Sequence, residues 1–202
     1  MKIFMWSGPR NISTALLRSF SNRDDTIVYD EPFYSYYLKE TGLNHPMRDE
    51  IIHFYPTNEN DVIKKILEDK KGIFYQKHMT HHILDKTNIE WLEKGKNCFL
   101  IRHPSKVINS YIKKNTLSNI TDIGFDQMFR LFNYVKKNIS KNIIIVNADA
   151  LLEDPEIYIK KICTNLKIDF SIKMMKWPKG ITKDFGIWYN HWYHDIINSN
   201  GF

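Results

Sequence analysis

Short runs of β-branched and aromatic residues alternate along the chain with longer stretches in which apolar residues recur every three or four positions. The first pattern is typical of buried strands and the second of amphipathic helices. Because strand and helix patterns alternate, the order indicates βαβ units and a parallel sheet. The predicted strands are Lys2–Trp6, Thr26–Asp30, Ile73–Lys77, Asn97–Arg102 and Asn142–Asn147.

Two apolar stripes predict helices that cover this sheet. Apolar residues recur at helical spacing over residues 62–67 and again over residues 125–139. Each stripe would turn one face of a helix toward a core. A further helix is predicted to start at Asp154-Pro155, because Asp caps helix N-termini and Pro suits the first turn.

Two other segments have weaker patterns. Thr87 followed by Glu90 predicts a capping box, and Gly95 predicts the end of the helix after it. Residues 41–60 hold two prolines and few periodic apolar residues, which predicts a surface excursion. The patterns together predict an α/β fold of three layers with a central, mostly parallel five-stranded sheet flanked by helices. We expect a single domain over residues 1–202.

The charge of the chain narrows the choice of partners. The formal net charge is +6 and the sequence pI is near 9.1, which favours an anionic ligand. Lysines such as Lys64, Lys113 and Lys136 fall on outward helical positions, so most of this charge is expected to form a solvated face. No apolar run approaches the roughly 20 residues of a membrane-spanning helix. We expect neither a membrane nor a nucleic acid as partner.

The first residues and the cysteines predict a cytoplasmic protein. Residues 1–6 reach a Gly-Pro turn at once, unlike a secretory signal. Cys98 and Cys163 both sit in apolar segments. Two buried free thiols are therefore expected rather than a disulfide, as in a reducing compartment.

The turn after the first predicted strand has the composition of an anion site. It contains Gly8, Pro9, Arg10, Asn11, Ser13 and Thr14, and a helical run follows. Free backbone N–H groups and the positive end of the helix dipole point at a ligand in such a turn. Arg10 adds charge, and Ser13 and Thr14 add hydroxyl donors. The Gly-Lys-Ser/Thr ending of a Walker A loop is missing, which argues against an ordinary ATP-hydrolysing enzyme.

A second polar corner follows the fourth predicted strand. Arg102 ends this strand, Pro104 opens a helix, and Ser110 lies one to two turns into it. A guanidinium and a hydroxyl so placed could bind one phosphate from two sides. We therefore expect the Arg102 guanidinium to lie close to the Gly8-Pro9 turn.

With these two corners the chain resembles the sulfotransferase family, which has a P-loop-NTPase-like fold. The family transfers a sulfuryl group from 3′-phosphoadenosine 5′-phosphosulfate (PAPS) and releases 3′,5′-diphosphoadenosine (PAP). The resemblance implies that the first corner binds the 5′-phosphosulfate and that Arg102 and Ser110 bind the 3′-phosphate. Arg10 stands where the family usually has lysine, and Ile12 where a glycine is common.

Two later segments are similar to the same family. Residues 149–155 match its acidic stretch before a late helix, and Trp188–Trp192 matches a C-terminal Trp-x-Asn-His segment. Lys179-Gly180 matches a Lys-Gly pair that in the family also contacts the 3′-phosphate. The resemblance implies a transferase that acts on a hydroxyl or amine of a small-molecule acceptor.

Sulfuryl transfer needs a general base, and two strand ends offer one. Glu31 lies in a Glu-Pro context that some sulfotransferases use, whereas others use a histidine just past a lysine on the third strand. His78 is the nearest match to that histidine, and His81 is a further candidate. Lys77 would stabilise the leaving oxygen together with Arg10. No zinc-binding pattern supports a metal site.

Three alternatives remain at this point. A P-loop-type nucleotide or small-molecule kinase would bind ATP and Mg²⁺. A non-catalytic nucleotide- or polyanion-binding protein would lose affinity steeply with salt. A protein that keeps the donor fold without turnover would fail an activity assay. Acceptor selection is assigned to the variable segments 34–55 and 116–125, and the sequence does not identify the acceptor.

Overall fold

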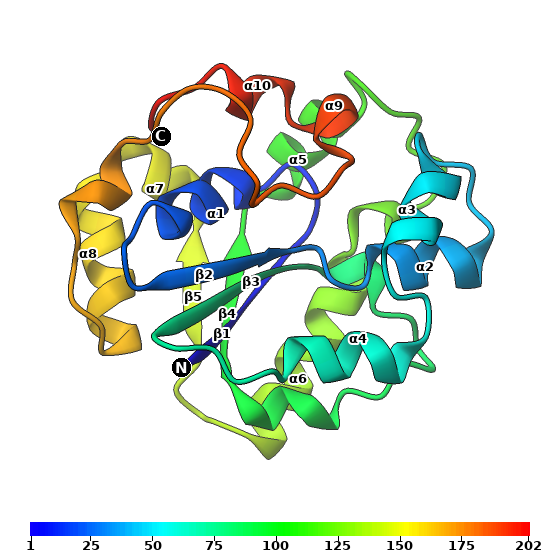
Figure 1. The fold of residues 1–202 in the computed structure, drawn as a ribbon, viewed down its shortest axis with the longest axis horizontal. Coiled ribbons are helices and arrows are strands. Elements are labelled where there is room, and N and C mark those ends of the chain that lie inside the picture. The colour runs from blue at the N-terminus through cyan, green and yellow to red at the C-terminus, as the bar shows by residue number, and fades with distance from the viewer.

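The computed structural model describes residues 1–202, and its centre is a five-stranded sheet in the order β2-β3-β1-β4-β5 (Figure 1). All four neighbouring pairs are parallel. The predicted α/β class and parallel sheet are confirmed, and each strand lies within two residues of its predicted bounds. The strands are β1 Lys2–Ser7, β2 Thr26–Asp30, β3 Ile73–Met79, β4 Lys96–Ile101 and β5 Ile144–Asn147.

Helices connect the strands and cover both faces of the sheet. They are α1 Ser13–Ser21, α2 Tyr34–Thr41, α3 Arg48–Phe54, α4 Glu59–Ile66, α5 Pro104–Tyr111, α6 Phe125–Asn138, α7 Ala148–Glu153, α8 Pro155–Leu166, α9 Tyr189–Trp192 and α10 His194–Ile197. Short 3₁₀ turns are η1 Thr80–His82, η2 Glu90–Lys94, η3 Ile120–Ile123 and η4 Ile172–Met175.

Alternation along the strands builds two separate cores. Ile3 and Met5 of β1 point to a core that α1, α7 and α8 cover, whereas Phe4 and Trp6 point to a core that α4 and α6 cover (Figure 1). A strand buried on both faces has no polar side to expose. This is why β1 appears in the sequence as a continuous apolar run.

One local prediction was wrong. Thr87 does not cap a helix, because its hydroxyl donates to the Tyr36 hydroxyl at 3.4 Å, and the Asn88 side chain instead accepts from the Glu90 backbone N–H at 2.8 Å. The predicted helix there is the 3₁₀ turn η2. The segment 41–60 lies mostly at the surface, as predicted, and it contains the short helix α3, whose seven residues bury Ile51 alone. One buried position is too few to create a periodic signal.

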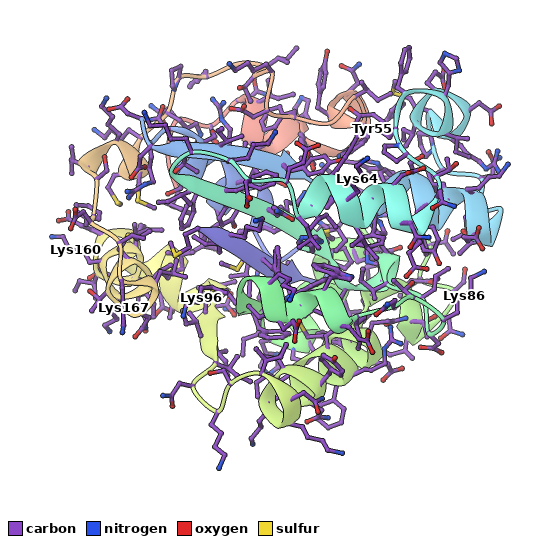
Figure 2. The ribbon with its side chains drawn as sticks, turned by 60° about the horizontal axis from the view of Figure 1, so that its bottom comes forward. Tyr55, Lys64, Lys86, Lys96, Lys160 and Lys167 are labelled. Carbon is purple, nitrogen blue, oxygen red and sulfur yellow. The ribbon has the colours of Figure 1, made fainter.

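The basic side chains and the cysteines lie as expected. Lys64, Lys86, Lys96, Lys160 and Lys167 are exposed and extend from the surface (Figure 2). Both cysteines are buried and unbridged, and burial raises the pKa of Cys98 to about 12. Among the helices, none has the length and apolarity needed to cross a bilayer.

The strand order determines where a ligand can bind. β1 lies between β3 and β4, so β2 and β3 lie on one side of β1 whereas β4 and β5 lie on the other, and the strand order reverses at β1. In open parallel sheets, ligands bind beyond the carboxyl ends of strands at such a point. The turns after β1, β2, β3 and β4 therefore meet at one edge of the sheet.

Candidate active site

The β1–α1 turn has an unusual backbone. Arg10 and Ile12 adopt positive φ values of 62° and 58°, whereas Asn11 between them does not. Alternation of this kind turns successive backbone N–H groups toward one concave side, which suits an anion. Ile12 thus keeps the conformation that a glycine would adopt, at a cost of roughly 1–2 kcal/mol for a branched side chain.

Polar side chains hold this turn and line the cavity beside it. Asn11 is buried, its amide donates to the Leu100 carbonyl at 3.3 Å, and its Oδ1 has no partner. The Ser13 and Thr14 side chains line the same cavity, and neither hydroxyl makes a hydrogen bond within the protein. These groups are available to an anionic ligand at the start of α1.

The second corner contacts the first directly, as predicted. Arg102 Nη1 donates to the Arg10 carbonyl at 2.9 Å, and Arg10 Nε donates to Ser110 Oγ at 2.9 Å. Both corners line one cavity of about 300 Å³. The Arg102 guanidinium therefore lies against the turn after β1 and not in bulk solvent.

The first residue of the acidic stretch 149–155 orients Arg102. Asp149, at the start of α7, accepts from Arg102 Nε at 3.1 Å and pairs with Lys106 Nζ at 3.1 Å. Burial opposes ionisation, but the hydrogen bonds from Lys106 and Arg102 hold the pKa of Asp149 below its ordinary value. Asp149 and the Arg10 carbonyl together fix the guanidinium, and Arg102 lines the cavity.

The Lys179-Gly180 pair does not reach this cavity. Lys179 is exposed, and the Gly180 N–H donates to the Ile197 carbonyl at 2.8 Å. The Arg18 guanidinium, from the middle of α1, donates to the carbonyl of Pro178, the residue before Lys179. Residues after α10, including Ser199 and Gly201, line the cavity instead.

A second, larger cavity of about 470 Å³ begins at the same turn. Arg10, Ser13 and Thr14 line both cavities, as do Trp192 and Tyr193 from the C-terminal segment. The ends of β2 and β3 form another part of its wall. The two cavities therefore share one boundary at the amino end of α1.

The wall from β2 and β3 contains a buried ionic cluster of Asp30, Glu31, Lys77 and Tyr193. Lys77 Nζ contacts Asp30 Oδ1 at 3.1 Å, Glu31 Oε1 at 2.5 Å and Tyr193 OH at 2.6 Å. The Tyr193 hydroxyl lies 2.7 Å from Asp30 Oδ2 and 3.1 Å from Glu31 Oε1, and it accepts from Trp188 Nε1 at 3.0 Å. The sequence indicated Tyr193 only as a residue that could stack on adenine, and it assigned Asp30 no role in the site.

Burial and charge set the protonation of this cluster. Burial raises the pKa of Glu31, although Lys77 opposes part of the effect. Burial alone would lower the pKa of Lys77, but Asp30 and Glu31 outweigh it and raise the pKa. Two carboxylates thus face one ammonium, and a φ of 43° at Glu31 adds backbone strain of the kind that concentrates at functional sites.

The role expected for Lys77 changes with this geometry. An ammonium has three N–H donors, and Lys77 directs them to the three acceptors of the cluster. None remains for a leaving oxygen. Arg10, which lies at the boundary of the two cavities, is the cation that the structure places there.

Strand alternation separates the histidine candidates. Lys77 and His78 are consecutive on β3, so their side chains point to opposite faces of the sheet. His78 is 1% exposed, packs against Trp6 and Trp91, contacts the Gln76 side chain at 3.2 Å, and does not line the cavity. Burial lowers the pKa of His78 to about 3.

His81 and His82 do line the larger cavity. The His82 ring stacks between Tyr34 and Tyr37, with centroids 4.7 and 4.8 Å away. Burial lowers the pKa of His81 to about 3, so its imidazole is neutral near pH 7. The structure contains no cluster of three His, Cys, Asp or Glu side chains that could hold a metal ion.

This fold and the paired corners define a P-loop-like α/β class with a polar cavity at the carboxyl edge of its sheet. The sulfotransferase domain model matches residues 1–202, and the chain belongs to that family of transferase enzymes. Two plant relatives, the branched-chain-amino-acid aminotransferase-like proteins 1 and 2 of Arabidopsis thaliana, are each 33% identical over 202 residues. The match covers 99% of this chain and 36% of each relative, so the chain spans about a third of their length.

Solved structures confirm the fold. The sulfotransferase domain from the curacin biosynthetic pathway aligns with a TM-score of 0.58 at 14% identity, over 92% of this chain and 80% of that one. A sulfotransferase from Alicyclobacillus acidocaldarius aligns with a TM-score of 0.61 at 10% identity, over 87% of this chain and 85% of that one. At such identities the likeness concerns the fold alone.

Proposed function

We propose that the chain transfers a sulfuryl group from PAPS to a hydroxyl or amine of a small-molecule acceptor. One observation carries the proposal: the corner cavity and the larger cavity meet at Arg10, Ser13 and Thr14. A donor in the first cavity and an acceptor in the second would thus have their reacting groups at this shared boundary.

The residues of the two corners fit a bisphosphorylated nucleoside. The turn from Gly8 to Thr14, which includes Pro9 and Asn11, would hold the 5′-phosphosulfate with backbone N–H groups, hydroxyls and the Arg10 guanidinium. Arg102 and Ser110 would hold the 3′-phosphate. Lys179 and Gly180 lie away from the cavity, so in this chain we assign them no donor contact.

Glu31 is the proposed general base. It lines the acceptor cavity, and its raised pKa suits a carboxylate that takes a proton near neutral pH. The acceptor proton moves to Glu31 Oε while the acceptor oxygen or nitrogen forms a bond to sulfur. The bond from sulfur to the bridging oxygen breaks, its electron pair stays on the 5′-phosphate, and PAP leaves. Arg10 would stabilise the charge that grows on this oxygen.

Calorimetry with PAP and AMP tests the donor assignment. We expect PAP to bind more tightly than AMP, because only PAP carries the phosphate that Arg102 and Ser110 would hold. Arg102→Ala should weaken PAP about ten- to a hundredfold, the loss of one charge-assisted contact, and leave AMP nearly unchanged.

The matched control is Arg48→Ala on α3, an arginine whose partner is Asp49 and which lines neither cavity. This variant should bind PAP as the wild type does. Equal affinity for PAP and AMP, or tighter binding of ATP with Mg²⁺, would contradict the proposed function.

A further inference from the structure

One charged side chain on the wall of the larger cavity has no oppositely charged partner in the protein. Five charged side chains line this cavity: Arg10, Glu31, Lys77, Lys114 and Asp122. Arg10 and Lys114 lie 3.9 and 3.2 Å from Asp195 Oδ2, and Glu31 pairs with Lys77. Asp122 alone among the five makes no ion pair.

The Asp122 carboxylate is fixed in position. Its Oδ2 accepts the backbone N–H groups of Ser118 and Asn119 at 3.0 and 2.9 Å, and these bonds cap η3. Its Oδ1 has no hydrogen-bond partner in the protein. The wall of the cavity thus carries a carboxylate that is rigidly held through one oxygen and unpaired at the other.

Neighbouring side chains respond to this charge but do not neutralise it. Burial lowers the pKa of His45, and the negative charge of Asp122 opposes the effect only in part. The pKa of His81 falls to about 3 by burial despite Asp122. Burial raises the pKa of Tyr111, and Asp122 raises it further. Near pH 7 the cavity histidines are therefore no counter-ions for Asp122.

Aromatic side chains complete the surroundings. Tyr34, Tyr111, Trp192 and Tyr193 all line the same cavity. Aromatic faces attract organic cations, and they do so more strongly where water is partly excluded. The Asp30–Glu31–Lys77 cluster also holds two carboxylates for one ammonium. Because Lys77 and Lys114 are paired within the protein, the unpaired Asp122 carboxylate and the aromatic side chains favour a positive ligand in this part of the cavity.

We propose that the acceptor is a hydroxyl compound that also carries an organic cation, with Asp122 as its counter-ion. This inference rests on the proposed function. A protonated amine held by a carboxylate has no lone pair, so the hydroxyl oxygen is the atom that attacks sulfur. The proton of that hydroxyl moves to Glu31, and the new bond is an oxygen–sulfur bond. The cation serves to orient the acceptor.

Three phenols of similar shape and different charge test this inference by calorimetry in the presence of saturating PAP. Tyramine is cationic, 4-propylphenol is neutral, and 3-(4-hydroxyphenyl)propanoate is anionic. We expect tyramine to bind most tightly and the propanoate least. Asp122→Asn should weaken tyramine about five- to tenfold, as for one partly exposed ion pair with aromatic contacts, and should leave 4-propylphenol unchanged.

The control variant is Asp126→Asn, on the first turn of α6, which changes an exposed carboxylate that makes no ion pair. It should keep the wild-type preference. Asparagine at position 122 retains an oxygen that can accept the two capping N–H groups, and thermal unfolding checks this. Failure of PAP to bind would remove the proposed function, whereas PAP binding without a preference for tyramine would overturn this inference alone.

Discussion

At the scale of single residues, the Glu31 carboxylate is the group on which the proposed chemistry depends. Its oxygen receives hydrogen bonds from both Lys77 and Tyr193, and it lies at the wall of the larger cavity. These contacts hold the carboxylate in one place. A base that is fixed within reach of the acceptor contributes to the rate of transfer and not to the affinity for the donor.

Glu31→Gln should separate these two effects. The amide keeps the shape of the side chain but cannot take a proton, so kcat should fall by about 100- to 10,000-fold. PAP affinity, measured by calorimetry, should stay within about twofold. A variant that transfers at the wild-type rate would exclude Glu31 as the base.

Tyr193→Phe should shift the pH dependence of the reaction. Burial raises the pKa of Glu31, whereas Lys77 and the hydrogen bond from Tyr193 both lower it. Removal of the hydroxyl should therefore raise this pKa and move the acidic limb of the kcat profile to higher pH. Tyr189→Phe is the control, because the Tyr189 hydroxyl makes no hydrogen bond in the protein. An unmoved acidic limb would show that Tyr193 has only a packing role.

His78→Gln should make the protein less sensitive to acid. The pKa of His78 is about 3 in the folded protein, whereas an unfolded histidine has about 6.5. Between these values the unfolded chain binds the proton, so stability falls as the pH drops below about 6.5. At pH 5 this costs about 2 kcal/mol of unfolding free energy relative to pH 7.

Urea unfolding at both pH values measures this difference. The variant should be less stable than the wild type at pH 7, because the aromatic packing of the imidazole is lost. Between pH 7 and pH 5, however, it should lose about 2 kcal/mol less unfolding free energy than the wild type does. The exposed His53, replaced in the same way, should leave the wild-type loss unchanged. Equal losses in the His78 variant and the wild type would mean that the folded protein protonates His78 normally.

At the scale of elements, the β1–α1 turn is positioned by a segment that is distant in the sequence. A Cβ built on Gly8 would lie 2.6 Å from the Ile123 carbonyl oxygen of η3. This contact involves backbone, which cannot move aside as a flexible side chain can. The close approach explains why a glycine stands at this position.

Gly8→Ala should therefore lower both stability and donor affinity. Overpacking against the backbone should cost about 1–3 kcal/mol of unfolding free energy. Gly42→Ala is the comparison, because its Cβ would meet open space and only its positive φ of 68° opposes the change. Gly42→Ala should cost about 1 kcal/mol and leave PAP affinity intact. Similar PAP affinities in the two variants would contradict the role given to the Gly8–η3 contact.

The elements that the sequence predicted well share one physical property. The central strand β1 is buried on both faces and left a continuous apolar run, the other strands left β-branched and aromatic runs, and the two corners follow directly from the strand ends. The short helix α3 and the 3₁₀ turn η2 bury few side chains and left little periodicity. The observed roles of Tyr193 and Asp149 were not predicted, because the contacts that give them these roles span 163 and 47 residues.

One inference about β3 failed for a reason that the sequence already contained. His78 and Lys77 were both considered for the same cavity, although neighbours on a strand must point to opposite faces. Only Lys77 reaches the cavity wall. The resemblance to a family histidine that follows a lysine suggested His78. The alternation of side chains along the strand, which places Lys77 and His78 on opposite faces, was the better guide.

At the scale of the whole molecule, the two cores share one sheet. β1 contributes to the core under α1 and α8 through one face and to the core under α4 and α6 through the other. Loss of either core would expose one side of the central strand. We therefore expect residues 1–202 to unfold as one cooperative unit, as predicted for a single domain.

Guanidinium unfolding followed by two probes tests this expectation. Tryptophan fluorescence reports on Trp6 and Trp91 in one core and Trp188 in the other. Far-ultraviolet circular dichroism reports on all helices together. The two transitions should coincide, and a biphasic curve would show that the cores are separate units.

The reach of Tyr193 across the molecule has a consequence for biosynthesis. A ribosome releases Asp30, Glu31 and Lys77 early, and the hydroxyl that joins them lies 116 residues beyond Lys77. A nascent chain of this protein thus carries an incomplete cluster until Tyr193 has left the ribosome. Translation products that stop before Tyr193 would therefore lack the hydroxyl that joins the two carboxylates and the ammonium, and we expect them to be inactive.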